Sequence, residues 1–322
     1  MTSLGDFEFD TIIVGGGPAG LCAGMYAGRG MLKSVVLESK VPGGELLNTE
    51  KIEDYPGFES ILGRELAERM TDHAKKFGAE IRQVTVDGIH RLHDGTFEVT
   101  TIDGEKYHAP TVILTAGGTP TKLDVPGELE YAGFGVSYCA VCDGAFFRQQ
   151  TIAVIGGGDA AVEEADYLTR YAAKVYLIHR RDELRASKIL QERLFANPKI
   201  EVIWNKRVLE IEGRDDKGMK EITGLRLEDT VTGHPSHLAV SGCFVFVGFK
   251  PNTGLVKEHF QHDASGYVIT DDRMMTSIPG LFAAGDLRVQ LVRQVTTAVG
   301  DATTAAIAVE KYLTHRRSAV RV

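Results

Sequence analysis

Two cysteines separated by two residues offer the clearest chemistry in this sequence. Cys139 and Cys142 enclose Ala140 and Val141, and Asp143 follows directly. A C-x-x-C pair can close a small disulfide ring, and its thiolates can exchange with other disulfides. A neighbouring carboxyl group can deliver and remove protons as the sulfur atoms are reduced and reoxidised. The pattern therefore indicates a redox-active dithiol, with Cys139, Cys142 and Asp143 as the catalytic candidates.

A zinc site and a purely structural disulfide are the alternatives for this pair. Structural zinc needs two further ligands, usually from a second C-x-x-C pair or a pair of nearby histidines. The other two of the four cysteines, Cys22 and Cys243, stand alone in apolar surroundings, which predicts buried, inert thiols. A C-x-x-C pair in a cytosolic protein is more often redox-active or metal-binding than structural. Redox catalysis is the favoured interpretation.

Two glycine-rich turns flank the cysteine pair, Gly15–Gly20 and Gly156–Ala161. Each follows an apolar strand and precedes a helix and a second strand, in the ranges 11–14, 18–30 and 34–37 for the first copy and 151–155, 159–173 and 174–178 for the second. A strand, glycine turn and helix in this order form the Rossmann dinucleotide site, where pyrophosphate lies at the helix N-terminus. The sequence therefore predicts two nucleotide sites. Ala161 replaces the third glycine of the second copy, which is consistent with NADP binding.

The residues after the second strand of each copy differ in charge. Glu38 lies 23 residues after Gly15, and His179 lies 23 residues after Gly156, followed by Arg180, Arg181 and Arg185. A carboxylate accepts hydrogen bonds from ribose hydroxyl groups and repels a 2′-phosphate, whereas guanidinium groups bind that phosphate. The first site therefore fits FAD and the second fits NADPH.

The chain is expected to form an α/β fold with two Rossmann-like domains. Turn signals within 87–116 and 200–247 suggest antiparallel strands beside each unit, with a hairpin at Thr232-Gly233. Residues 117–120 and 248–252 could link the domains. A strand at 281–286 and a helix at about 295–313 would complete the first domain, so that the second is an insertion.

Composition narrows the class of partner. The 322 residues carry a net charge of −8, which argues against nucleic acid and anionic membrane surfaces. No apolar run is long enough to span a membrane. The first ten residues are acidic and lack the pattern of a secretory signal. The expected compartment is the cytoplasm.

Several motifs together carry a family resemblance over nearly the whole chain. They are Gly15–Gly20, Pro42–Leu46, Tyr55–Gly57, Gly135–Gly144, Gly156–Ala165, His179–Asp182 with Arg185-Ala186, Phe282–Asp286 and Arg293-Gln294. In this order they resemble the low-molecular-weight, bacterial-type thioredoxin reductases. The resemblance implies a homodimer with one FAD per subunit, an FAD-binding domain at 1–119 and 248–322, and an NADPH-binding domain with the dithiol at 120–247.

The resemblance also implies residue roles. Electrons would pass from NADPH through FAD to the Cys139–Cys142 disulfide and then to thioredoxin. Cys142 would face the flavin, Cys139 would attack thioredoxin, and Asp143 would donate and accept protons. The implied NADPH contacts are Gly156, Gly158, Asp159, Ala160, Ala161, His179, Arg180, Arg181 and Arg185. The other implied cofactor contacts are Gly15, Gly17, Pro18, Ala19, Gly20, Glu38, Gly44, Glu45, Leu46, Asp54, Val86, Gly285, Asp286, Arg293, Gln294 and Val295.

Four positions depart from the usual family pattern. Val141 stands where threonine is commonest, and Asp54 where asparagine is frequent. Phe134 replaces a frequent arginine, and Ala145 precedes Phe146 where two aromatic residues are common. The last two predict selectivity between thioredoxins.

Two other classes of redox protein fit the sequence less well. Lipoamide and glutathione reductases carry a C-x₄-C pair in the first FAD region, and residues 38–60 contain no cysteine. A non-enzymatic sensor that binds FAD would not need the arginine cluster. NADPH-dependent bleaching of the flavin followed by thioredoxin turnover separates the sensor from the enzyme.

Overall fold

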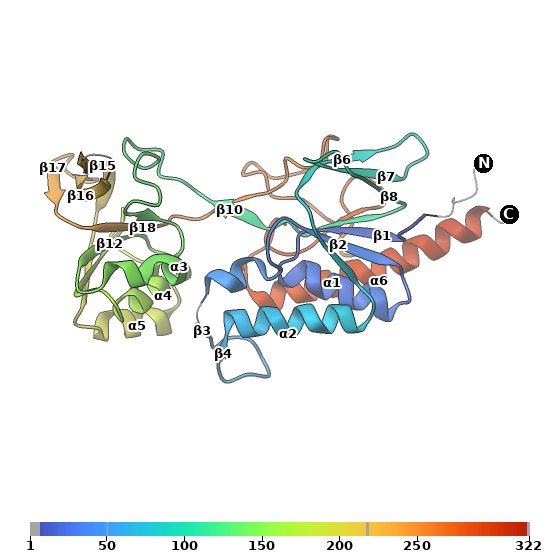
Figure 1. Cartoon of the computed structure of the whole chain (residues 1–322), viewed down its shortest axis with the longest axis horizontal. Helices are drawn as coiled ribbons and strands as arrows, with labels where there is room; N and C mark the ends of the chain where they lie inside the picture. Colours follow the sequence, from blue (N-terminus) through green and yellow to red (C-terminus); the bar gives the residue numbers. More distant parts are fainter. Residues whose placement is uncertain (1–6, 50, 217–218, 321–322) are drawn as a thin grey trace. The chain divides into compact units, whose positions relative to one another are not determined.

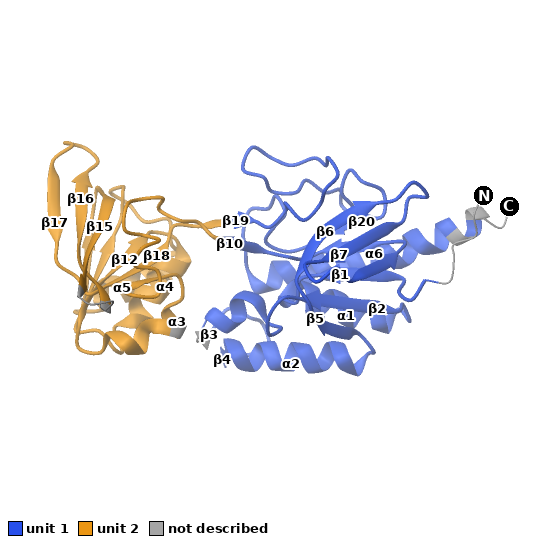
Figure 2. Ribbon diagram, turned by 45° about the horizontal axis from the view of Figure 1, so that its top comes forward, with its two compact units in different colours: residues 1–119, 250–322 blue, residues 120–249 orange. Residues whose placement is uncertain are grey.

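The computed structural model describes residues 7–49, 51–216 and 219–320, apart from the side chains of residues 51, 142, 216, 219, 317, 319 and 320. The chain forms two compact units, shown in two colours in Figure 2. Unit 1 consists of residues 1–119 and 250–322, and unit 2 of residues 120–249.

Unit 1 is built on a five-stranded parallel sheet. Its strand order is β20 (Leu281–Ala283), β9 (Val112–Leu114), β1 (Thr11–Val14), β2 (Ser34–Glu38) and β5 (Glu80–Gln83). Strands β1, β9 and β20 are buried along their whole length, as expected for parallel strands that are covered on both faces. Because β20 comes from the C-terminal segment, both ends of the chain contribute to one core.

Helices and an antiparallel sheet cover the two faces of this parallel sheet. Helices α1 (Pro18–Arg29), α2 (Gly63–Lys76) and α6 (Val295–Val320) lie on one side, and β6 (Val86–Arg91), β7 (Phe97–Thr101) and β8 (Lys106–Ala109) on the other (Figure 1). Ile13 and Ile113 pack in the helix-side core, whereas Ile12 and Leu114 pack with the antiparallel strands. This alternation follows from the period of two in a strand. A short segment with η1 (Gly44–Asn48), β3 (Lys51–Ile52) and β4 (Ile61–Leu62) connects β2 to α2.

Unit 2 repeats the parallel design. Its sheet has the order β11 (Val136–Ser137), β18 (Gly242–Phe246), β12 (Thr151–Gly156), β13 (Lys174–Ile178) and β14 (Ile200–Ile203). Its helices are α3 (Ala140–Asp143), η2 (Gly144–Phe147), α4 (Asp159–Leu168) and α5 (Lys188–Ala196). Strands β15 (Lys206–Asp216), β16 (Met219–Asp229) and β17 (Pro235–Leu238) form an antiparallel sheet.

Both chain crossings are short strands. They are β10 (Gly118–Pro120) and β19 (Phe249–Pro251). On the unit 2 side Thr121 N donates to Gly248 O at 2.8 Å, and on the unit 1 side Asn252 N donates to Gly117 O at 2.9 Å. The segments predicted as linkers are therefore hydrogen-bonded backbone.

The α/β prediction is confirmed, but three strands are assigned differently. Strand β9, within the predicted antiparallel stretch 87–116, and strands β14 and β18, within 200–247, are parallel strands of the two main sheets. A short apolar run does not reveal its partner, because pairing depends on residues far away in sequence. The predicted hairpin is confirmed, since residues 230–234 join β16 to β17 and Gly233 has φ +73°. Helix α4 ends at Leu168, five residues before the predicted end at 173, and α6 runs beyond the predicted 313.

Helix α6 is 26 residues long. Even so, none of the helices in the described part of the chain combines the length and the apolar character that a membrane crossing requires.

Candidate active site and cofactor-binding sites

The first glycine turn joins β1 to α1 with little space around its backbone. Gly15 has φ +108°, and a Cβ there would lie 2.5 Å from the carbonyl oxygen of Thr115. A Cβ at Gly20 would lie 1.8 Å from the carbonyl oxygen of Gly15. The N-cap of α1 is Gly17, which offers no side-chain cap, and an added Cβ there would meet only Gly44 at 3.8 Å. No side chain caps the N–H groups at the start of this helix, and the N-cap position is uncrowded, which suits a pyrophosphate.

The Glu38 carboxylate lies beside this turn at the end of β2. Its Oε2 accepts a hydrogen bond from Gly16 N at 2.6 Å, and its Oε1 accepts one from Lys40 N at 2.9 Å. A carboxylate has about four lone-pair positions. Glu38 is therefore fixed by the backbone and retains acceptor capacity for the hydroxyl groups of a ribose, as FAD requires.

A second turn of unit 1, Gly285-Asp286, follows β20. Gly285 N donates to Asp301 Oδ2 at 3.2 Å, and the same oxygen lies 2.8 Å from Arg288 Nη1 in a nearly buried ion pair. Burial raises the pKa of the Asp286 carboxyl, the Arg293 cation opposes this, and the Glu45 carboxylate adds to it. Arg293 Nε also donates to Asp286 O at 3.1 Å. Glu45 of η1 and Arg293, just before α6, therefore lie close enough to influence the carboxyl group of Asp286, and the cofactor contacts expected of these residues stay a prediction.

The remaining residues predicted for the first site have varied surroundings. Leu46 is 3% exposed and Ala19 is 5% exposed, so both side chains belong to the core and only their backbone can face a ligand. Val295 begins α6 and packs against the core around Leu46. Asp54 is exposed between β3 and β4, and Val86 begins β6. Among the described residues, no hydrogen bond or ion pair ties these last two to the glycine turn.

The second glycine turn joins β12 to α4 in the same way. The N-cap Gly158 provides no side-chain cap, and a Cβ there would meet nothing within 4 Å. A Cβ at Gly156 would lie 2.5 Å from the methyl group of Ala161, so this alanine packs directly on the turn in place of the usual third glycine. Ala160 is exposed beside it. The open helix N-terminus again fits a pyrophosphate.

His179 lies beneath this turn rather than with the exposed arginines. Its ring is 6% exposed, and Nδ1 donates to Gly156 O at 2.9 Å. A Cβ at Gly157 would lie 2.3 Å from the ring. Burial lowers the pKa of His179, which favours the neutral imidazole. Its Nε2 has no hydrogen-bond partner among the described residues.

The three arginines after β13 are exposed cations on a loop held against the glycine turn. Arg185 N and Ala186 N donate to Gly157 O at 2.7 and 3.2 Å. Within the described ranges, the guanidinium groups of Arg180, Arg181 and Arg185 form no ion pair with a carboxylate. Free guanidinium groups on a fixed loop can form bidentate bonds to a 2′-phosphate.

The cysteine segment follows β11 in unit 2. Cys139 is disulfide-bonded, whereas Cys22 and Cys243 are free and buried, which confirms the prediction for these two thiols. Ser137 Oγ accepts from Cys139 N at 3.0 Å and lies 3.1 Å from Cys139 O, and Asp143 N donates to that oxygen at 3.2 Å. The Cys142 side chain lies outside the described atoms, so its predicted role stays a prediction.

A buried carboxylate that sequence reasoning missed supports this segment. Glu128 is 1% exposed and accepts hydrogen bonds from Tyr138 Oη at 2.7 Å, Leu123 N at 2.9 Å and Asp124 N at 2.7 Å. Tyr138 directly precedes Cys139. A single Glu ten residues before a Tyr carries no local motif, so only the folded chain reveals the pair.

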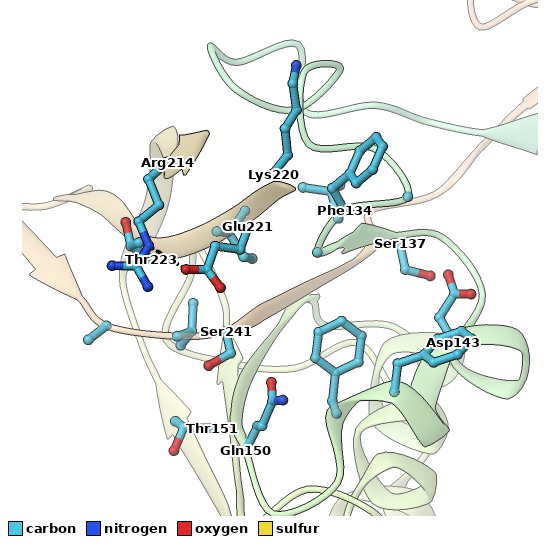
Figure 3. A pocket seen from close by; sticks show the side chains of 18 of the residues that line it. Phe134, Ser137, Asp143, Gln150, Thr151, Arg214, Lys220, Glu221, Thr223 and Ser241 are labelled. Carbon is cyan, nitrogen blue, oxygen red and sulfur yellow. Dashed lines mark hydrogen bonds and ion pairs between the residues drawn. The ribbon is translucent and has the colours of Figure 1, made fainter. Parts of the chain in front are cut away.

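A cavity of about 900 Å³ opens beside the cysteine segment (Figure 3). It lies near the amino ends of β12 and β18, whereas the glycine turn follows the carboxyl end of β12. Ser137 and Asp143 border it, and Phe134 and Phe146 line it with exposures of 52% and 75%. Its polar rim includes Gln150, Thr151, Arg214, Lys220, Glu221 and Ser241. Exposed aromatic rings beside a hollow are typical of a protein-binding surface.

Two nucleotide-binding turns and a disulfide-bonded cysteine define a pyridine-nucleotide-dependent disulfide oxidoreductase. The model of the pyridine nucleotide-disulphide oxidoreductase family matches residues 9–302. Thioredoxin reductase of Bacillus subtilis is 46% identical over 312 residues, covering 95% of each chain, and that of Listeria monocytogenes is 46% identical over 306 residues, covering 95% of this chain and 94% of that one.

Solved structures agree with these relatives. Lactococcus lactis thioredoxin reductase is 44% identical with a TM-score of 0.92 and covers 95% of this chain and 99% of that one. The T. acidophilum enzyme is 36% identical with a TM-score of 0.89, at 95% and 99% coverage. The chain therefore belongs to the thioredoxin reductases of the pyridine nucleotide-disulphide oxidoreductase family. This confirms the resemblance, the fold class and an oxidoreductase that uses FAD and NADPH.

Proposed function

We propose that this protein reduces the disulfide of thioredoxin with electrons from NADPH. One observation carries the proposal: the end of β2 bears a carboxylate beside the first glycine turn, whereas the loop after β13 bears three exposed arginines beside the second. Glu38 is fixed to Gly16 at 2.6 Å, and the equivalent position of unit 2 leads into three arginines without carboxylate partners in the described ranges. Cys139, disulfide-bonded, lies in the same unit as the arginines.

The two units divide the cofactors between them. Unit 1 would hold FAD by the N–H groups of the α1 N-terminus, by Glu38 and by the turn at Asp286. Unit 2 would hold NADPH by the N-terminus of α4 and by the loop of residues 179–187 between β13 and α5, here called the arginine loop. When bound, FAD would take a hydride from NADPH and supply two electrons to the disulfide.

The residues of the chain itself carry out the exchange. Two electrons and two protons convert the Cys139–Cys142 disulfide to two thiols, and Asp143 holds or moves a proton at the sulfur. The Cys139 thiolate then attacks the thioredoxin disulfide, and one thioredoxin sulfur leaves as a thiolate. Cys142 attacks Cys139 in the mixed disulfide, which restores the internal disulfide and releases reduced thioredoxin.

The partner would dock over the cavity beside Cys139. Phe134 and Phe146 supply apolar contact area there, and Ser137 and Asp143 border the same hollow. We also propose that the protein works as a homodimer in the cytoplasm. Sedimentation of the purified protein measures whether it is a dimer. Fractionation of cells shows whether it lies in the cytoplasm.

Anaerobic spectroscopy tests the function in two steps. NADPH should bleach the flavin absorbance of the purified enzyme, and oxidised thioredoxin should then restore it. Cys139→Ser and Cys142→Ser should each abolish thioredoxin turnover. Turnover that survives either substitution, or a flavin that NADPH does not bleach, would exclude this electron route.

A further inference from the structure

Asp159, the first residue of α4, binds through its carboxylate to the loop that follows β13. Its Oδ1 accepts a hydrogen bond from Ser187 N at 2.6 Å. Ser187 is the N-cap of α5 and comes two residues after Arg185. The carboxylate therefore connects the glycine turn to the far end of the loop that carries the arginines.

The arginine loop is attached to the glycine turn at three levels. At its start, His179 Nδ1 donates to Gly156 O at 2.9 Å. In its middle, Arg185 N and Ala186 N donate to Gly157 O at 2.7 and 3.2 Å. At its end, Ser187 N donates to Asp159. The middle attachment is between backbone groups, and the first uses the buried ring of His179. Only the last uses a partly exposed side chain, Asp159, which can be substituted without disturbing the core.

A carboxylate at this position has an electrostatic disadvantage for cofactor binding. The N-terminus of α4 stabilises negative charge. Asp159 and a cofactor phosphate would both lie there, so the two negative groups would repel each other. A side chain whose only role was cofactor contact would serve better as a neutral donor. The bond to Ser187 supplies a reason for an acceptor here, because a carboxylate takes a backbone N–H more strongly than a neutral oxygen does.

We propose that Asp159 is a positioning residue for cofactor choice. It holds the arginine loop against the glycine turn before the cofactor binds, so that the guanidinium groups are already in place for a 2′-phosphate. The proposal rests on the NADPH site inferred above. Fixing a loop in its bound conformation lowers the entropy cost of binding. This benefit applies only to ligands that carry the 2′-phosphate, so Asp159 should affect discrimination more than overall affinity.

Titration calorimetry of the FAD-loaded enzyme with two probes measures this directly. Adenosine 2′,5′-bisphosphate carries the 2′-phosphate, and 5′-AMP lacks it. In Asp159→Ala the ratio of the Kd for the bisphosphate to the Kd for 5′-AMP should rise by roughly three- to tenfold relative to the unaltered enzyme, as the loss of one charge-assisted hydrogen bond allows. The ratio of KM for NADPH to KM for NADH should shift in the same direction.

Two variants serve as controls. Asp159→Asn keeps an oxygen for Ser187 N, so it should retain the discrimination, while both probes bind somewhat more tightly because a negative charge is gone. Asp166→Ala removes a similar bond on the same helix, from Asn197 Nδ2 to Asp166 Oδ1 at 2.8 Å. It joins α4 to the other end of α5, so its loss should leave the ratio unchanged.

The results test the role of Asp159 and the NADPH site separately. If the ratio of the two Kd values is unchanged in Asp159→Ala, or if Asp166→Ala shifts this ratio as much, the proposal is wrong. If the unaltered enzyme does not distinguish the two probes, the NADPH site itself is wrong.

Discussion

The hydroxyl of Tyr138 donates a 2.7 Å hydrogen bond to Oε1 of Glu128, and this bond joins the residue before Cys139 to a carboxylate that is only 1% exposed. Buried charge is costly unless it is hydrogen-bonded. Glu128 meets this condition through Tyr138 and the N–H groups of Leu123 and Asp124. One carboxylate therefore ties the segment entering unit 2 to the segment that carries the dithiol.

Replacing Tyr138 by Phe should lower stability and change its dependence on pH. Glu128 loses one donor, which should cost about 1–3 kcal/mol at neutral pH. Burial, and then the Glu128 hydrogen bond, raise the pKa of Tyr138. Its contribution to stability is therefore complete below the ordinary tyrosine pKa of about 10 and is lost as pH rises above that value.

Urea unfolding between neutral pH and the alkaline range measures this effect. The variant should lose less stability than the unaltered protein as pH rises, because its phenyl ring cannot ionise. Tyr176→Phe is the matched control in unit 2, since its hydroxyl has no hydrogen bond among the described residues. Parallel stability curves for Tyr138→Phe and the unaltered protein would contradict the assignment.

The sequence predicts those parts of the site that lie within a local motif. The glycine turns, Glu38 and the arginine loop each belong to one strand–turn–helix pattern, so their places in the fold follow from nearby residues. Glu128 and Asp301 do not. Glu128 bonds to Leu123, Asp124 and Tyr138 within a short stretch that matches no motif. Asp301 bonds to Gly285 and Arg288, which the tertiary fold brings close. Asp159 shows a third case: its position at the helix start was predictable, whereas its bond to Ser187, 28 residues away, was not.

Glu38→Ala should weaken the retention of FAD. The substitution removes the acceptor of Gly16 N at 2.6 Å together with the acceptor predicted for the ribose, at a cost of about 1.5–3 kcal/mol for bonds to a charged group. The ratio of flavin to protein absorbance after gel filtration measures the loss. Glu65→Ala, which removes an exposed ion pair with Arg69 on α2, should retain the flavin. Equal flavin content in both variants would exclude the role of Glu38.

Arg180→Ala combined with Arg185→Ala should remove most of the preference for NADPH. Each guanidinium can make charge-assisted bonds to the 2′-phosphate, so KM for NADPH should rise by roughly a hundredfold while KM for NADH changes little. Steady-state kinetics with both cofactors gives the ratio. Arg207→Ala removes a cation paired with Glu228 in the same unit and should leave the ratio intact. A similar loss with both cofactors would mean that the loop does not recognise the 2′-phosphate.

Phe146→Ala should weaken thioredoxin docking without affecting electron entry. The ring is 75% exposed at the cavity beside Asp143, and the loss of an aromatic anchor should raise KM for thioredoxin by roughly tenfold. Flavin bleaching by NADPH should keep its rate. Val231→Ala changes a residue that is 76% exposed outside the cavity and should alter neither quantity. An unchanged KM for thioredoxin in Phe146→Ala would show that thioredoxin docks at another surface.

Thiol labelling should separate the reactive cysteines from the buried ones. Burial raises the pKa of Cys243 to about 12 and also raises the pKa of Cys22, so both remain protonated and shielded in the folded protein. After mild reduction, iodoacetamide should label only Cys139 and Cys142, and mass spectrometry of the peptides locates the labels. In denaturant all four cysteines should react. Labelling of Cys243 in the folded protein at the same rate as Cys139 would show that the core around β18 opens, and the proposed division between reactive and inert thiols would then be wrong.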